Sequence, residues 1–351
     1  MTGVQNIYGD LNIDNAIKAV SINAPDLELV AGQFEITNAT ILATLNLAKL
    51  TTVGTLQFTT LPALGQIGLT SGLTSAESVI ISDTSITSLE GINVFELKVF
   101  NINNNGEIDV INSGLQKVTT GLTITDNNPS VNVTLDQLES TKDLSLAKIG
   151  SLSATNLTSV NGSLSVIDTS VESLDFKELT SIGNSLTVDT NDALDSIDFP
   201  KLTSVGGALE IGQNDDLEDF GGFPELETIG GTVNLTGSFN NGSFPSLKRV
   251  AGGFIIDSKD GELTCSSFDK LNSNGVVRGN QYACSGADGA SSSSSSKSGS
   301  SNGVVSESGS SSAASSTSSE SSSKQNDGAV AAPGKLTAML AGFAAFGIAL
   351  F

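Results

Sequence analysis

Apolar residues recur at nearly constant spacing through the first three quarters of the chain. The segment from Leu202 to Ile211 shows the pattern, with apolar side chains at positions i, i+3, i+7 and i+9. About twelve copies follow one another, from Val4 to Ile256, with a mean period of about 22 residues. Such a period is typical of a solenoid, in which each unit buries its apolar face only against its neighbours. The pattern therefore predicts one solenoid over residues 1–262.

Each copy ends in a strand-like alternation. In Leu186-Thr-Val188 the apolar positions are two residues apart, which is the period of a β-strand. The rest of each unit is rich in Thr, Ser and Gly and contains pairs such as Phe199-Pro200, so helix formers are sparse. We therefore expect an all-β fold, a parallel β-helix with two or three short strands per coil. Four leucines at the first position of successive copies should stack as a ladder: Leu157, Leu179, Leu202 and Leu226.

The copies share the Leu-x-Leu-x-x-Asn signature of leucine-rich repeats. An Asn at its end can turn inward and bond the backbone of the corner. Three copies end in this residue, at Asn127, Asn191 and Asn214. Other copies are less regular, those at Leu50, Leu73 and Leu138 being one residue shorter and the one near Leu97 collapsed.

The ends of a solenoid expose unpaired strand edges and need caps. Cys265 and Cys284, the two cysteines of the chain, follow the last copy. Because the segments after them carry the signals of a secreted protein, we expect a disulfide that closes a C-terminal cap over residues 263–285. Met1 stands only three residues before a repeat start, which predicts that a signal peptide and an N-terminal cap are missing from this chain.

Composition changes sharply after the second cysteine. Ser and Thr make up most of the segment 286–335, which is expected to be an extended, O-glycosylated stalk. Residues 336–351 are apolar and uncharged, and at about 24 Å as a helix they are short of a bilayer core. Small residues, a spacer and a hydrophobic tail form the signal for exchange of the tail for a glycolipid. We expect attachment at Asn326, with Gly328 as the alternative, and hence anchoring to the outer leaflet of the plasma membrane.

Charge and composition exclude several functions. With 16 basic and 38 acidic residues the formal net charge is −22, which argues against nucleic acid as a partner. The chain has no His, which removes Ser–His and Cys–His nucleophile pairs and His-ligated zinc. We therefore expect no enzymatic activity, no catalytic residues, no cofactor and no metal.

Candidate modification sites are the Asn-x-Ser/Thr sequons. Those between two inward apolar positions should point outward, and exposed sequons of a secreted protein are usually glycosylated. Six are present, at Asn38, Asn132, Asn156, Asn161, Asn234 and Asn241.

An acidic cluster over 214–219 could provide paired carboxylates for glycoside cleavage or a calcium site. It falls at a turn between two coils. Equivalent turns of other coils, such as 190–192, have a related sequence with fewer acidic residues. We therefore interpret it as a solvated turn.

Several segments together resemble a known family. The Phe-Pro-x-Leu-x-x-Val/Ile-Gly-Gly repeats resemble the receptor L-domain, a right-handed β-helix. The segments 79–91, 99–105 and 271–279, with the Ser-rich stalk and apolar tail, resemble fungal GPI-anchored cell-wall glycoproteins, the family of sporulation-specific and protoplast-secreted wall proteins. The resemblance covers essentially the whole chain. It implies a secreted cell-surface or cell-wall protein, without known catalytic residues, that is needed for wall organisation and integrity. Wall polysaccharides or wall proteins are the implied partners.

Two other functions stay open on the residues alone. A receptor-like module could bind a wall polysaccharide or protein on its sheet face, although the outward positions are mostly Thr, Ser, Asn and Asp. An acid-dependent glycosidase would need two acids about 5 to 9 Å apart in a groove.

Overall fold

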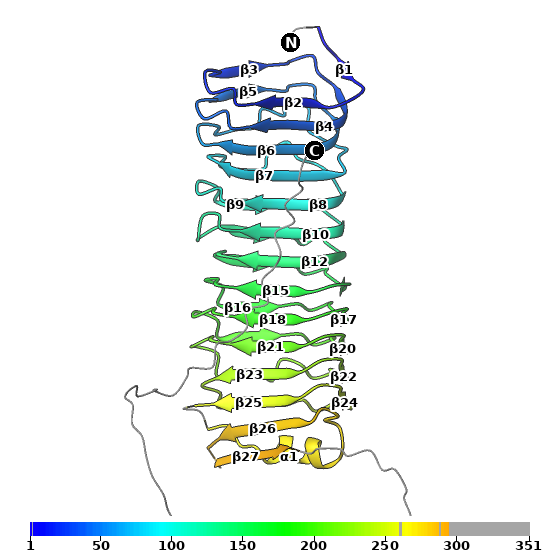
Figure 1. The fold of residues 1–351 in the computed structure, drawn as a ribbon, viewed down its shortest axis with the longest axis vertical. Helices are drawn as coiled ribbons and strands as arrows, with labels where there is room; N and C mark the ends of the chain where they lie inside the picture. Colours follow the sequence, from blue (N-terminus) through cyan, green and yellow to red (C-terminus); the bar gives the residue numbers. More distant parts are fainter. Residues whose placement is uncertain (2, 260–261, 288, 295–351) are drawn as a thin grey trace, which may run out of the picture. The chain divides into compact units, whose positions relative to one another are not determined.

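The computed structural model describes residues 1, 3–259, 262–287 and 289–294. Its coils stack from β1 to the helix α1, which lies beside the last strands (Figure 1). The parallel β-solenoid has about 12 turns, as the repeat pattern predicts. Within the described residues no helix is long and apolar enough to cross a membrane.

One large sheet extends from the first coil to the last. All its pairings are parallel except that of β26 with β27, which is antiparallel. Its strands are β1 (Asn6–Ile7), β2 (Leu11–Asp14), β4 (Leu29–Thr37), β6 (Thr52–Leu61), β7 (Ser78–Thr84), β8 (Glu96–Asn103), β10 (Lys117–Thr125), β12 (Ser140–Ala147), β14 (Ser159–Val160), β15 (Leu164–Ile167), β17 (Ser181–Ile182), β18 (Leu186–Asp189), β20 (Ser204–Val205), β21 (Leu209–Gly212), β22 (Thr228–Ile229), β23 (Val233–Gly237), β24 (Arg249–Val250), β25 (Phe254–Ser258), β26 (Gln281–Gly286) and β27 (Gly289–Ser294).

A second face of the solenoid carries shorter strands in three separate parallel groups. The groups are β3 (Ser21–Asn23) with β5 (Thr44–Asn46), β9 (Val110–Asn112) with β11 (Asn132–Thr134) and β13 (Ser151–Ser153), and β16 (Ser173–Asp175) with β19 (Ser196–Asp198). Two coils between β5 and β9 have no strand on this face.

The core is a set of ladders in which equivalent residues of successive coils stack. Leu186 pairs in register with Leu209, and Val188 with Ile211, so the period-two positions that the sequence predicts all point inward. The predicted leucine ladder is confirmed as fully buried, at Leu157, Leu179, Leu202 and Leu226. In the irregular copy near Leu97, this leucine occupies the second apolar position of the repeat and not the first. It pairs in register with Val118, the second apolar residue of the copy that follows.

Inward Asn side chains hold the corner after the main strand, as the signature predicts. Asn191 Nδ2 donates to the Val166 carbonyl oxygen (3.1 Å), and Asn214 Nδ2 to that of Val188 (3.0 Å). Asn214 Oδ1 in turn accepts from the Asn191 backbone N–H (2.9 Å), so each Asn joins neighbouring coils. These side chains are buried with their hydrogen bonds made, which avoids the cost of an unpaired buried polar group.

The residue before each of these corners has a left-handed backbone. Ten successive coils place a non-glycine residue there at φ between 50° and 58°. This conformation disfavours most side chains but is tolerated best by Asn and Asp. Those residue types hold most of the column, which consists of Asn15, Asn38, Thr60, Asp83, Asn104, Asp126, Lys148, Asp168, Thr190 and Gln213.

The Phe-Pro and Gly-Gly motifs pack coil against coil. The Phe199 ring stacks between Phe176 (centroids 5.2 Å apart) and Phe223 (5.1 Å). A Cβ on Gly206 would lie 2.1 Å from the Gly183 carbonyl oxygen, so this turn can approach its neighbour only without a side chain.

The last coil is closed by α1 (Ser266–Ser273) and the β26–β27 hairpin. A disulfide joins Cys265, at the start of α1, to Cys284 on β26. Phe268 of α1 is buried with its ring centroid 5.8 Å from that of Phe254. Tyr282 donates its hydroxyl to Asp269 (2.7 Å), so the helix is held to the last coil by packing, a hydrogen bond and a covalent bond. The repeat pattern does not predict this helix.

Removing the disulfide should lower stability by roughly 3 kcal/mol, the chain-entropy estimate for a loop of about 20 residues. The test compares thermal unfolding of the native protein with that of the Cys265→Ser/Cys284→Ser double variant. Alkylation of native, non-reduced protein should find no free thiol at either position. Two alkylated cysteines in that experiment would contradict the pairing.

Candidate functional site

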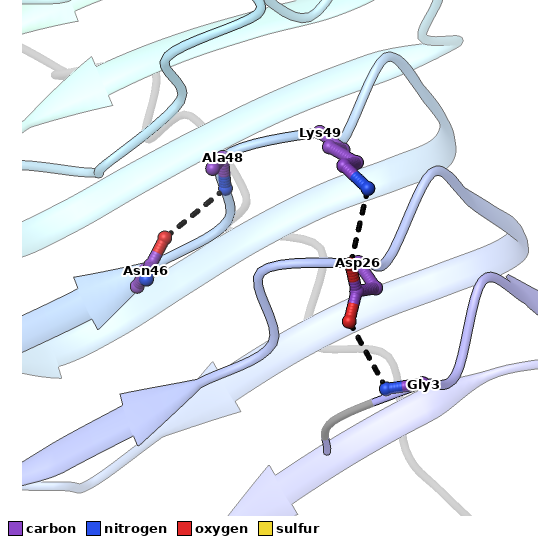
Figure 2. Close-up of polar contacts among 5 residues, drawn as sticks. All are labelled: Gly3, Asp26, Asn46, Ala48 and Lys49. Atoms are coloured by element: carbon purple, nitrogen blue, oxygen red, sulfur yellow. Dashed lines mark hydrogen bonds and ion pairs between the residues drawn. The ribbon is translucent and has the colours of Figure 1, made fainter.

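Charged side chains form ion pairs between neighbouring coils on the outer surface. Figure 2 shows the first, in which Lys49 Nζ lies 3.0 Å from Asp26 Oδ1 while Asp26 Oδ2 accepts from the Gly3 backbone N–H (3.1 Å). The Lys49 hydrogen bond, followed by the Gly3 one, lowers the pKa of Asp26. Four further pairs have the same Lys-to-preceding-coil arrangement, Lys98–Glu77, Lys148–Asp126, Lys201–Glu178 and Lys248–Glu227. Because all these side chains are at least partly exposed to solvent, each pair contributes little to stability.

Asp136 is the common acceptor of a separate group of hydrogen bonds. Its Oδ1 accepts from the Ser153 hydroxyl (2.6 Å), and from the backbone N–H (3.2 Å) and hydroxyl (3.1 Å) of Thr155. The Ser153 bond is the main reason why the pKa of Asp136 is lowered, against an opposing effect of desolvation.

Asp136→Asn should therefore lower the thermal midpoint near neutral pH, and the difference from wild type should shrink below about pH 4. A folded-state pKa below the unfolded value stabilises the fold above the unfolded pKa, and this contribution disappears as the pH falls through the folded pKa. Thermal unfolding followed by circular dichroism across this range is the measurement, with the exposed turn variant Asp216→Asn as control. A midpoint difference that does not change with pH would contradict the assignment.

The six sequons lie at different depths on the surface. Asn132 and Asn234 are exposed on strands β11 and β23, between buried neighbours, and Asn161 is exposed at a turn. Asn156 and Asn241 are exposed but donate their amide hydrogens to the Asp136 carbonyl oxygen (2.7 Å) and to Asp219 Oδ2 (2.8 Å). Asn38 is half-buried, and its amide donates to Asn15. Their glycosylation stays a prediction. The anchor residues Asn326 and Gly328 lie outside the described residues.

The acidic cluster is a turn whose acids bond to the next coil. Asn214 turns into the core, while Glu218 and Asp219 accept hydrogen bonds from Asn240 (2.8 Å) and Asn241 (2.8 Å). Among the described residues no group of three or more acidic or Cys side chains is placed to hold a metal ion.

A polar groove of about 490 Å³ opens where the second face lacks strands, between β5 and β9. Loops 66–72 and 88–93 form its walls, and its backbone includes Gly68, Gly72 and Gly91 at positive φ. Six exposed polar side chains line it, those of Gln66, Thr70, Ser71, Ser88, Glu90 and Asn93. The repeat pattern does not predict this groove, although the shortened copy at Leu73 and the irregular one near Leu97 lie in the same region.

A second, smaller groove of about 300 Å³ lies along the left-handed corner column. Lys148, Asp168 and Asp192 from three neighbouring coils line it, and all three are exposed. The hydrogen bond from Lys148 to Asp126 (2.7 Å) raises the pKa of Lys148, and Asp168 adds a smaller effect.

These features define a solenoid repeat protein with a long polar surface and shallow grooves. No family model and no solved structure matches the chain. It is 37% identical over 287 residues to the cell surface GPI-anchored protein ECM33 of Candida albicans, covering 81% of this chain and 69% of that protein. It is 34% identical over 292 residues to the cell wall mannoprotein PST1 of Saccharomyces cerevisiae, covering 83% and 65%. It is 30% identical over 287 residues to the cell wall protein ecm33 of Schizosaccharomyces pombe, covering 82% and 67%.

The chain belongs to this family of fungal cell-wall and GPI-anchored cell-surface proteins, as the resemblance of its segments predicts. It spans 65% of the length of the S. cerevisiae mannoprotein.

Proposed function

We propose that the chain is a non-enzymatic, GPI-anchored glycoprotein of the fungal cell surface that is required for cell-wall organisation and integrity. The observation that carries this proposal is the family relationship over about four fifths of the chain, to proteins named for the cell wall and for a GPI anchor. The solenoid supports it physically, because a stack of coils held by buried ladders gives a stiff body with a long polar surface.

Two properties of the residues support a non-enzymatic role. The chain has no His to act as general base, and the carboxylates that line the two grooves are exposed.

A receptor-like module that binds a wall polysaccharide or protein is the second candidate function, and the polar groove between β5 and β9 favours it.

The phenotype of a strain without this gene tests the role in the wall. We expect increased sensitivity to wall-binding dyes, restored by the full chain preceded by a secretion signal. A form that keeps the stalk and tail but lacks residues 4–257 should fail to restore growth. Normal dye resistance of the deletion strain, or rescue by the stalk alone, would contradict the proposal.

Anchoring has its own test. Phosphatidylinositol-specific phospholipase C should release the secreted protein from membranes, and an Arg substitution at Ala344, within the apolar tail, should prevent anchoring because a charge disrupts recognition of the tail. The C-terminal peptide of the mature protein should end at or near Asn326. A mature protein that still ends at Phe351 and resists the phospholipase would contradict a glycolipid anchor.

A further inference from the structure

The polar groove is built by a local departure from the repeat. Coils before it have β3 and β5 on the second face, and coils after it have β9, β11 and β13, whereas the two coils between form loops. Backbone hydrogen bonds fix these loops to their neighbours. Ser71 N donates to the Ala48 carbonyl oxygen (2.8 Å), at the turn drawn in Figure 2, and Asn93 N donates to that of Leu73 (2.8 Å). The walls are therefore preformed, which lowers the entropy cost of binding a ligand.

Three glycines let these loops pack closely against each other and against the coil before them. They account for three of the six positive-φ glycines in the described chain. A Cβ on Gly68 would lie 1.9 Å from the Leu45 carbonyl oxygen, and one on Gly72 would lie 2.5 Å from Asn93 Nδ2. The Asn93 amide is thus placed directly over the backbone of the opposite wall. The volume of about 490 Å³ falls within the usual range for small-ligand sites, roughly 300 to 1,000 Å³.

The side chains in the groove suit an uncharged ligand with many hydroxyl groups. Two amides, three hydroxyls and one carboxylate line it, so the groove offers both hydrogen-bond donors and acceptors. The lining contains no Lys or Arg, the residues that bind phosphate or carboxylate groups, and its single charge, at Glu90, repels anions. Neighbouring hydroxyls of a sugar ring both donate and accept hydrogen bonds, as amide and carboxylate groups require.

An exposed aromatic residue, Phe95, follows the groove wall 88–93 by two positions in the chain. Phe95 is 56% exposed, which is rare for Phe in this chain, since most others are buried in the core. Asn93 and Phe95 are both exposed, and buried Val94 lies between them. The ring lies over Gly114 of the next coil, because a Cβ there would be 3.8 Å from Phe95 Cε1. The C–H face of a sugar can pack on such a ring.

We propose that this groove, together with the exposed Phe95 that follows its wall in the chain, binds a segment of an uncharged polysaccharide. Gln66, Glu90 and Asn93 bond its hydroxyl groups, and Phe95 packs against the adjoining sugar. This inference deepens the proposed function, on which it rests for the presence of polysaccharide around the protein.

The test is calorimetric titration of the secreted full chain with three neutral hexasaccharides, of β-1,3-linked glucose, β-1,4-linked N-acetylglucosamine and α-linked mannose. A phosphorylated mannose oligosaccharide serves as the charged comparison. We expect at least one neutral oligosaccharide to bind, and more tightly than the phosphorylated one. Phe95→Ala and Asn93→Ala should each weaken that binding by about tenfold or more, the loss of roughly one good contact. Tyr8→Ala, which removes an 84% exposed ring on the first coil, should leave it unchanged.

Lack of binding by all three neutral sugars at millimolar concentration would overturn the proposal, as would preferential binding of the phosphorylated sugar. Binding that survives both groove substitutions would overturn the assignment to this groove. Circular dichroism of each variant checks that it is folded. These results are independent of the dye phenotype, so the groove can fail while the role in the wall stands.

Discussion

Gly206→Ala is expected to destabilise the solenoid by about 3 kcal/mol or more, at the upper end of overpacking effects. The added Cβ would lie 2.1 Å from the carbonyl oxygen and 2.8 Å from the carbonyl carbon of Gly183. Both are backbone atoms of the preceding coil, so no side-chain rotation relieves the clash. Either the two coils separate locally, which breaks parallel hydrogen bonds, or the turn is distorted.

Gly121→Ala is the matched control. Gly121 lies in the main-sheet strand β10, and a Cβ there meets nothing within 4 Å. Its substitution should change the free energy of unfolding by about 0.5 kcal/mol or less. Denaturant-induced unfolding of both variants is the measurement. Equal stabilities for the two would show that a Cβ at Gly206 fits between the coils without disturbing their packing.

Leu202→Ala should cost about 2–5 kcal/mol, because a fully buried leucine leaves a cavity that rigid neighbouring coils cannot fill. Leu202 occupies the middle of the ladder between Leu179 and Leu226. Ile41→Ala, at a side chain that is 45% exposed, is the control and should have a small effect. A loss below about half a kcal/mol for Leu202→Ala would mean that the coils at this position are not tightly packed.

Features that repeat in the sequence could be predicted because each copy confirms the others. The leucine ladder and the inward Asn127, Asn191 and Asn214 are of this kind. The column of buried polar side chains at this corner includes more residues than the Asn signature indicates. Thr84 and Thr169 donate their hydroxyls to Asn105 (2.7 Å) and Asn191 (2.7 Å), so Thr substitutes where the Asn pattern ends.

Features that do not recur from coil to coil could not be predicted from the repeat pattern. Helix α1 has only eight residues, and three Ser and one Asn among them are weak helix formers. Its one signal is the spacing of Phe268 and Leu271, which places both on the side that packs against the last coil. The groove depends on the positive φ of three glycines and on two coils that lack a strand, and a repeat pattern describes only what the coils have in common.

We propose that the folded solenoid serves the cell wall without catalysis. The most direct test is rescue of the deletion strain, on plates with a wall-binding dye, by the Asp168→Asn/Asp192→Asn variant. This variant removes the two exposed carboxylates that share one groove and leaves the buried ladders intact. We expect growth equal to that with the wild-type gene, whereas the coil-disrupting Gly206→Ala should rescue poorly. Loss of rescue by the double Asn variant, with normal folding and normal amounts at the cell surface, would contradict a non-enzymatic role.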